Sequence, residues 1–140
     1  MQELIQFGEK HPLLCSAILA VFALLFIVEV LRLNRVRRMI SPADATQLIN
    51  RQRAEVLDLR SKEQFKTGHI IDSTNVSAQE LVDNPKKIEK FKQKPLVIVC
   101  PTGGESQKVA ALLAKKGYNS YSIAGGIRAW VDAQMPLVKE

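Results

Sequence analysis

The sequence predicts an α/β domain with a parallel sheet, preceded by one transmembrane helix. An apolar run without any charged residue covers residues 12–28. Short apolar segments then alternate with helical segments over residues 41–140, as in chains built from βαβ units. The clearest strand, residues 95–100 (PLVIVC), lacks a charged residue, as expected for a strand in a sheet covered on both faces.

The apolar run is predicted to be a retained membrane anchor. Residues 12–31 contain Glu29 as their one charged residue and reach the ~20 residues that a spanning helix needs. A cleaved signal peptide would carry positive charge before this run and a small-residue cleavage site after it. Here residues 1–10 carry two acids and one lysine, and the run ends in EVLRLNRVRR. A buried core helix would show an amphipathic stripe, which is missing. We therefore expect a short tail at 1–11, a transmembrane helix at 12–31 and a basic linker at 32–40.

Basic residues after the anchor predict its orientation. Four arginines follow it closely: Arg32, Arg35, Arg37 and Arg38. Because positively charged flanks stay in the cytoplasm, we expect the N-terminus outside and the domain, residues 41–138, in the cytoplasm. The net charge of +6 also suits nucleic acid, but this basic cluster adjoins the anchor and suits anionic headgroups. Membrane lipid, and not nucleic acid, is the expected partner.

In the first half of the domain, residues that typically begin or end helices predict where the helices lie. Ser41 and Pro42 fit an N-cap and a first helical position, which predicts a helix to about Asn50. Gly68 fits the end of a short helical turn that begins at Ser61. The other segments are short and are predicted from their composition: a strand at 55–59 ending at Asp58, a strand at 73–77, and helical pieces at 78–82 and 85–93.

The second half repeats the alternation of strand and helix. The strand at 95–100 is followed by a helix at 105–116, which Gly117 closes. A strand at 118–123 precedes a glycine pair and a short helix that ends near Ala133. This order predicts parallel pairing with helical crossovers.

Cys100 lies where the clearest strand gives way to a helix, the edge at which parallel α/β domains bind ligands. Gly103 and Gly104 allow the loop to curl with its N–H groups inward, which forms a concavity for anions. The following helix adds its N-terminal N–H groups. Such a setting favours the thiolate, the reactive form of cysteine. The alternative left open is a buried strand-end cysteine without chemistry.

Other cysteine chemistries fit less well. A cysteine phosphatase needs an arginine to close the loop, but residues 105–108 read Glu-Ser-Gln-Lys. A thiol–disulfide motif needs a second nearby cysteine, and Cys15 lies inside the apolar run. A papain-like site needs a histidine base, whereas His69 suits a structural hydrogen bond. Sulfur transfer needs one cysteine and an anion-binding loop, and it is the favoured reaction.

Three segments resemble the rhodanese-like family: DLRSKEQFKTGHIIDSTNV at 58–76, CPTGGES at 100–106 and GGIRAW at 125–130. With its anchor, the whole chain resembles the membrane-bound bacterial members of this family, the YibN type. The resemblance implies a three-layer fold with a central five-stranded parallel sheet, and residence in the bacterial inner membrane. It also implies a cysteine persulfide, with thiosulfate or another persulfide as donor and cyanide, a thiol or a protein as acceptor. No cofactor and no metal are expected.

The resemblance assigns roles to individual residues. Cys100 falls on the nucleophile, and the anion cradle would comprise Thr102, Gly103, Gly104, Glu105 and Ser106. Asp58 and Arg60 would support an anion or the loop, although a salt bridge from Arg60 to Glu63 or Asp72 is an equal alternative. Three residues are expected to be structural: His69, Asn75 and Trp130.

Glu105 departs from the family pattern, which often has a cation or a threonine there. Its charge would repel an anionic donor and disfavour a persulfide. Thr102 and Glu105 also match a capping box, which would occupy the Thr102 N–H. We therefore expect Cys100 to carry sulfur but to use thiosulfate weakly. The sequence alone does not decide whether Lys108, one turn into the helix, reaches the loop and offsets Glu105. Two alternatives stay open: a non-catalytic module that binds a protein partner at the membrane, and a redox sensor without a resolving cysteine.

Overall fold

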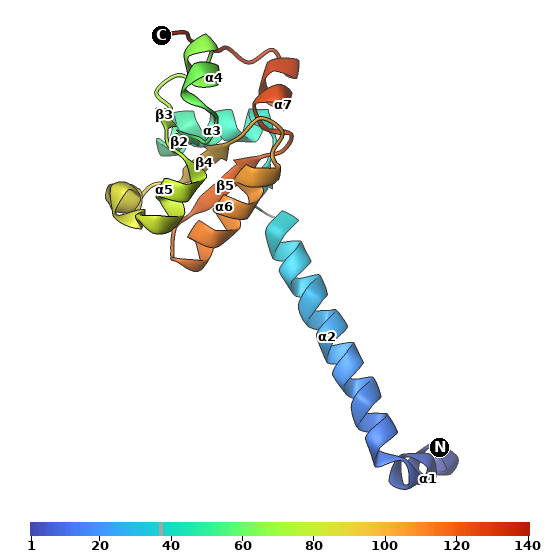
Figure 1. Cartoon of the computed structure of the whole chain (residues 1–140). Coiled ribbons are helices and arrows are strands. Elements are labelled where there is room, and N and C mark those ends of the chain that lie inside the picture. The colour runs from blue at the N-terminus through green and yellow to red at the C-terminus, as the bar shows by residue number, and fades with distance from the viewer. Residues whose placement is uncertain (37) are drawn as a thin grey trace. The chain divides into compact units, whose positions relative to one another are not determined.

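The computed structural model describes residues 1–36 and 38–140, so Arg37 of the predicted basic cluster lies outside the described residues. The chain divides into two units, Met1–Val36 and the residues that follow to Glu140. Figure 1 shows both units, and each is described separately below.

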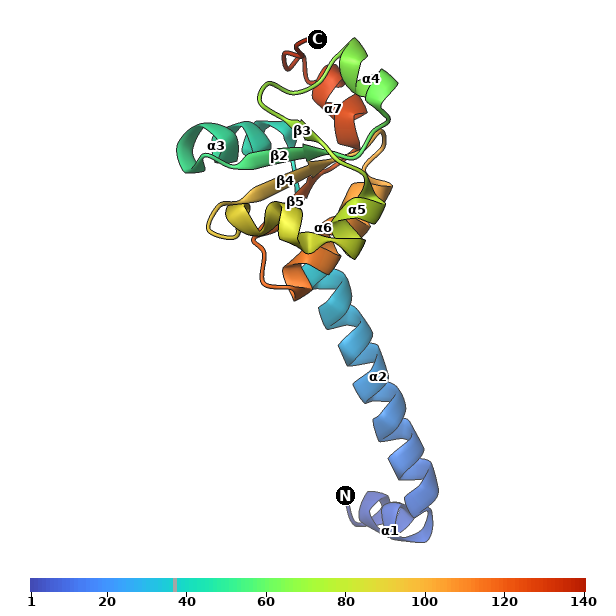
Figure 2. The ribbon, with the colours of Figure 1, turned by 60° about the vertical axis from the view of Figure 1, so that its left-hand side comes forward.

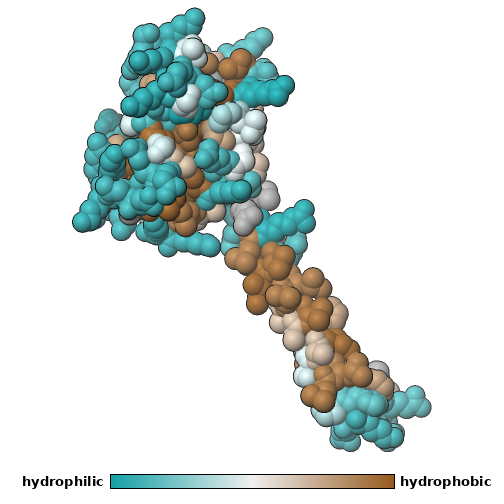
Figure 3. All heavy atoms as spheres, in the orientation of Figure 1, coloured by the Kyte–Doolittle hydropathy of each residue, from teal (hydrophilic) through white to brown (hydrophobic). Residues whose placement is uncertain are grey.

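The first unit consists of helices α1 (Gln2–Lys10) and α2 (Pro12–Val36). Within α2, Pro12–Asn34 is long and apolar enough to cross a membrane, which suits an anchor or a signal sequence. Hydrophobic side chains cover this helix in Figure 3. The predicted tail at 1–11 is thus mostly helical. Helix α2 also runs into the predicted linker, because no glycine or proline follows the apolar run to end it.

The second unit contains the expected five-stranded parallel sheet, in the order β1-β5-β4-β2-β3. Its strands are β1 (Met39–Ile40), β2 (Glu55–Asp58), β3 (Thr74–Asn75), β4 (Leu96–Val99) and β5 (Ser120–Ile123). The fold class is therefore confirmed. Strand β1 was assigned to the linker in the sequence prediction. It has only two residues, and its pairing depends on β5, about eighty residues further along the chain.

The helices of this unit agree with the predicted segments to within a few residues at each end. They are α3 (Pro42–Gln52), α4 (Lys62–Thr67), α5 (Ala78–Asp83), the 3-10 helix η1 (Pro85–Phe91), α6 (Gly104–Lys115) and α7 (Gly126–Asp132). Ser41 caps α3 as predicted, since its hydroxyl accepts the N–H of Asp44 at 3.1 Å. Local capping chemistry therefore sets where this helix begins.

Helices cover both faces of the sheet, with α3 and α7 on one side and α5 and α6 on the other (Figures 1 and 2). Successive side chains of β4 point to opposite faces of the sheet, so this strand contributes to the core on both sides. Leu96, Ile98 and Cys100 join the core cluster under α5, η1 and α6, whereas Val97 and Val99 join the cluster under α3 and α7. Cys100 is thereby presented on the α6 side, at the carboxyl end of the central strand.

Ile98→Ala is expected to lower the free energy of unfolding by about 2–5 kcal/mol, because the fully buried side chain would leave a cavity in the central strand. Chemical denaturation of the detergent-solubilised chain, followed by the fluorescence of Trp130, measures this loss. Ile71→Ala is the matched control, since Ile71 is 57% exposed and should change stability by less than about 0.5 kcal/mol. Equal losses in the two variants would contradict this layering.

Candidate active site

The Cys100 sulfur lies inside a ring of hydrogen-bond donors. Its side chain follows β4 directly and the residue is 1% exposed. The backbone N–H groups of Gly103 and Ser106 donate to Sγ at 3.0 and 3.3 Å, and the thiol itself donates to the Ser106 hydroxyl oxygen at 3.2 Å. Donors converging on a sulfur stabilise negative charge on it, so this arrangement suits a thiolate.

The loop closes because of one glycine and one buried serine. Gly103 has a φ of +95°, a conformation that favours glycine, and it is the N-cap residue of α6. Ser106 is fully buried beneath the loop, where its hydroxyl also lies 3.2 Å from the Gly103 carbonyl oxygen and donates to it. Gly104 is the first residue of α6, and a Cβ there would meet no atom within 4 Å. Of the two predicted loop glycines, only Gly103 is required by the backbone.

The mouth of the loop offers further donors. The N–H groups of Thr102, Gly104 and Glu105 make no hydrogen bond to any described residue, and all three residues are exposed. They lie around the N-terminus of α6, where N–H groups favour an anion. The five predicted cradle residues are thus brought together, with Ser106 below the sulfur and the others around the opening.

The predicted capping box between Thr102 and Glu105 is wrong. The N-cap is Gly103, one residue later, and no side chain caps α6. The carboxylate of Glu105 therefore lies outside the register in which it would accept the Thr102 N–H. Glu105 is exposed in the first turn of α6, so its effect on the site is confined to its charge.

The start of α7 holds the loop from behind. The N–H groups of Ile127 and Arg128 donate to the carbonyl oxygens of Cys100 and Pro101 at 2.9 and 3.4 Å. Gly126 has a φ of +64°, and a Cβ on it would clash with the Cys100 carbonyl oxygen and with the backbone of the loop. The loop carbonyls are therefore drawn towards α7. Sequence reasoning recorded the glycine pair as a motif but missed this role, which depends on a contact with a distant strand end.

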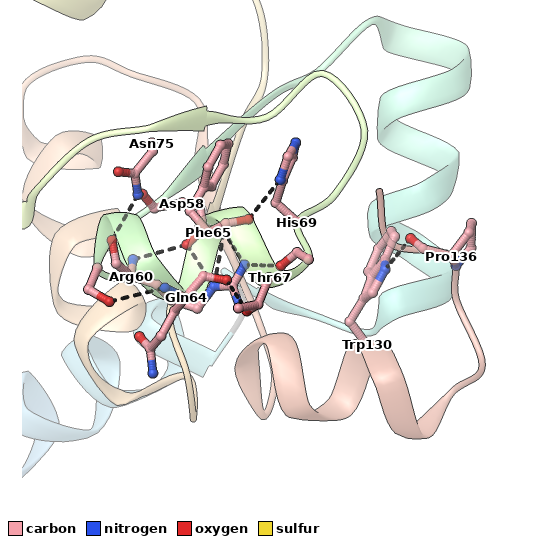
Figure 4. A network of polar contacts seen from close by, with 11 residues as sticks. Asp58, Arg60, Gln64, Phe65, Thr67, His69, Asn75, Trp130 and Pro136 are labelled. Carbon is pink, nitrogen blue, oxygen red and sulfur yellow. Dashed lines mark hydrogen bonds and ion pairs between the residues drawn. The ribbon is translucent and has the colours of Figure 1, made fainter. Parts of the chain in front are cut away.

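Asp58 and Arg60 form a buried pair next to the site (Figure 4). The Arg60 guanidinium donates to both carboxylate oxygens of Asp58, at 2.7–3.0 Å, and to the Gly68 carbonyl oxygen at 2.6 Å. Neither of the alternative partners, Glu63 and Asp72, is the acid that it contacts. Removing one member of such a buried pair costs about 3–5 kcal/mol, so the pair contributes to the stability of the fold.

The three residues expected to be structural have internal partners. The amide of Asn75 donates to the carbonyl oxygens of Asp58 and Arg60, at 3.1 and 2.8 Å. His69 stacks on Phe65, and its Nδ1 lies 2.8 Å from the Phe65 carbonyl oxygen. The Trp130 indole N–H donates to the Pro136 carbonyl oxygen at 3.1 Å (Figure 4). These predictions are confirmed.

A pocket of about 300 Å³ lies between α4, α7 and the C-terminal segment. Its lining residues are Arg60, Thr67, Gly68, Ile127, Arg128, Val131, Asp132 and Leu137. Arg60 therefore borders this pocket, and Cys100 is not among its lining residues.

Comparison with known proteins identifies relatives of this chain. The family model of the rhodanese-like domain matches residues 41–133. The chain is 33% identical over 141 aligned positions to the uncharacterized protein YibN of Escherichia coli K12, covering 99% of both chains. It is 34% identical over 90 positions to the thiosulfate sulfurtransferase GlpE of Pseudomonas savastanoi pv. phaseolicola, covering 64% of this chain and 83% of the relative.

A solved structure is similar as well. The crystal structure of a rhodanese-related protein from Thermoplasma volcanium aligns with a TM-score of 0.67 at 30% identity. The alignment covers 74% of this chain and 99% of that one.

Gly126→Ala is expected to displace the loop, because its Cβ would overlap the Cys100 carbonyl oxygen. Overpacking should lower the free energy of unfolding by about 1–3 kcal/mol, and the positive φ adds roughly 1 kcal/mol. The rate at which an alkylating reagent modifies Cys100 should also change, because the loop around its sulfur is displaced. Gly104→Ala is the control, since its Cβ would enter open space and should leave both measurements close to those of the parent chain. Indistinguishable behaviour of the two variants would refute the supporting role of α7.

Proposed function

Because this chain belongs to the rhodanese-like family, we propose that it is a membrane-tethered sulfurtransferase or persulfide carrier that uses Cys100. The observation that carries the proposal is the loop itself. Two backbone N–H groups are aimed at Sγ, and those of Thr102, Gly104 and Glu105 remain available at the mouth. An outer sulfur attached to Cys100 would extend towards these donors, which suit a persulfide anion.

The reaction balances with one nucleophile and no external base. The Cys100 thiolate attacks the outer sulfur of thiosulfate, the S–S bond of thiosulfate breaks, and sulfite leaves with the electron pair. Cys100 then holds a persulfide. A thiophilic acceptor, such as cyanide or a thiolate, attacks the outer sulfur, and the Cys100 thiolate returns. A persulfide donor follows the same steps, with a thiolate in place of sulfite.

Two features of the first unit support the proposed location. Helix α2 offers a span of 23 residues, and basic residues follow its apolar part. By the positive-inside rule, we expect the N-terminus outside and the domain in the cytoplasm of a bacterial inner membrane. The likeness to YibN over 99% of both chains supports a bacterial protein with this layout, since it includes the apolar helix.

Glu105 sets the preference for the donor. Its exposed carboxylate lies in the first turn of α6, at the side of the loop where thiosulfate, a dianion, would arrive. Like charges disfavour both the arrival of this anion and the persulfide anion. Glu105 repels a sulfur donor of lower charge, such as an organic persulfide, less strongly. We therefore expect thiosulfate to be a poorer sulfur donor for this protein than a persulfide.

Incubation of the full chain in detergent with a persulfide donor should add about 32 Da, one sulfur atom, to Cys100. Tandem mass spectrometry locates the adduct. Cys15→Ser should keep it and Cys100→Ser should lose it, which separates the two cysteines of the chain. A Cys100 that stays unmodified with every donor would reject sulfur carriage and favour a module that only binds a partner protein.

Glu105→Arg should raise thiosulfate:cyanide sulfurtransferase activity by about tenfold, because the repulsion of the anionic donor by a carboxylate is replaced by attraction to a guanidinium, at roughly 1 kcal/mol per unit charge in a water-like medium. The measurement is kcat/KM for thiosulfate. Glu89→Arg makes the same change of charge in η1, which precedes β4, whereas Cys100 follows β4, so this control should leave kcat/KM unchanged. The electrostatic argument fails if Glu105→Arg behaves like this control.

A further inference from the structure

The two edges of the sheet differ in charge. All five strands are parallel, so the segments that precede the strands lie together at one edge, here called the amino edge, and Cys100 lies at the opposite, carboxyl edge. Basic residues gather in the segments before β1, β2, β4 and β5. We call this set the cationic edge: Arg38, Arg51, Arg53, Lys92, Lys115 and Lys116.

Hydrogen bonds join these segments into one surface. The Arg38 guanidinium donates to the Ser120 carbonyl oxygen at 3.1 Å, and the adjacent Asn119 carbonyl accepts the N–H of Leu96. The ammonium of Lys92 lies 5.9 Å from the centre of the Tyr118 ring, and that of Lys116 donates to the Val82 carbonyl oxygen.

The charge of this surface is largely uncompensated. Apart from half-buried Arg38, the members of the cationic edge are exposed, and none forms an ion pair with a carboxylate of a described residue. Four acids lie in the segments before these strands: Glu55 pairs with Lys94 at 3.0 Å, Asp72 precedes β3, and Asp83 and Glu89 lie in α5 and η1, before β4. The carboxyl edge is mixed, with Lys62, Glu63, Glu105 and Arg128 among its exposed residues.

The chain enters the domain at this same edge. Strand β1 begins at Met39, only five residues after Asn34, the last residue of the candidate span. Even a fully extended connection of that length reaches at most about 18 Å. If α2 is the membrane anchor, the amino edge is held close to the headgroups, where basic residues are attracted to anionic lipid.

We propose that the cationic edge binds anionic phospholipid headgroups and holds the domain with its Cys100 loop turned towards the cytosol. This inference rests on the proposed membrane anchor. Lipid is the occupant that the molecule favours, because the anchor delivers this edge to the membrane surface. Substrates and acceptors would then approach from the opposite edge without competing with lipid.

The test uses the full chain in vesicles of phosphatidylcholine alone or mixed with anionic phosphatidylglycerol. A membrane-impermeant acetylating reagent labels outward-facing lysines, and mass spectrometry gives the rate at each one relative to Lys66. With anionic lipid, Lys92, Lys115 and Lys116 should react about fivefold more slowly, the factor expected for one basic residue held at such a surface. Lys62 should react equally in both vesicles. The difference should vanish at about 1 M salt, where the Debye length falls to about 3 Å.

A matched pair of variants sharpens the result. Arg51→Gln with Arg53→Gln should reduce the protection of Lys92, Lys115 and Lys116, whereas Lys62→Gln with Lys139→Gln, which removes equal charge elsewhere, should not. Equal labelling in the two vesicle types would overturn the proposal and assign the cationic edge to an acidic protein surface. Flotation and carbonate washing test the anchor separately. A chain that washes off the vesicles rejects the anchor, whereas an inserted chain with equal labelling rejects the lipid contact alone.

Discussion

The site depends on the direction in which the loop after β4 turns its peptide groups. The N–H groups of Ile127 and Arg128 draw the carbonyl oxygens of Cys100 and Pro101 towards α7. With these carbonyls held away, the N–H groups of the loop are left to face the sulfur and the mouth. Gly126 makes this possible, because only a residue without a Cβ fits against the Cys100 carbonyl. Two strand ends and two helix starts thus together build the loop of N–H groups around one cysteine.

The parallel sheet separates Cys100 from the segment through which the chain enters the domain. Its carboxyl ends carry Cys100 and the buried pair of Asp58 and Arg60, and its amino ends receive the chain through β1. Buried apolar side chains of β4 lie between the two edges. A charge placed at one edge is therefore distant from the other, so the surroundings of Cys100 and the amino edge can be changed independently by mutation.

Features with a local cause were predictable from the sequence. The start of α3 is predicted from Ser41 and Pro42, because these residues suit the N-cap and the first helical position. The apolar composition of β4 predicts that it is a central strand. The Cys100 loop was likewise expected from its glycines, although only Gly103 proved necessary. Features that depend on remote partners were not predictable: β1 exists through pairing with β5, and the acid that Arg60 contacts is chosen by burial and not by sequence spacing.

The brief strand β1 has a consequence for how the second unit can be produced alone. Residues 38–40 cover one side of β5, where Ser122 and Ala124 donate to the carbonyl oxygens of Arg38 and Ile40. A fragment that starts at residue 41 would leave β5 as an open sheet edge, with backbone groups free to pair with another copy. The residues just before α3 therefore also protect against edge-to-edge aggregation, and a well-behaved fragment must retain them.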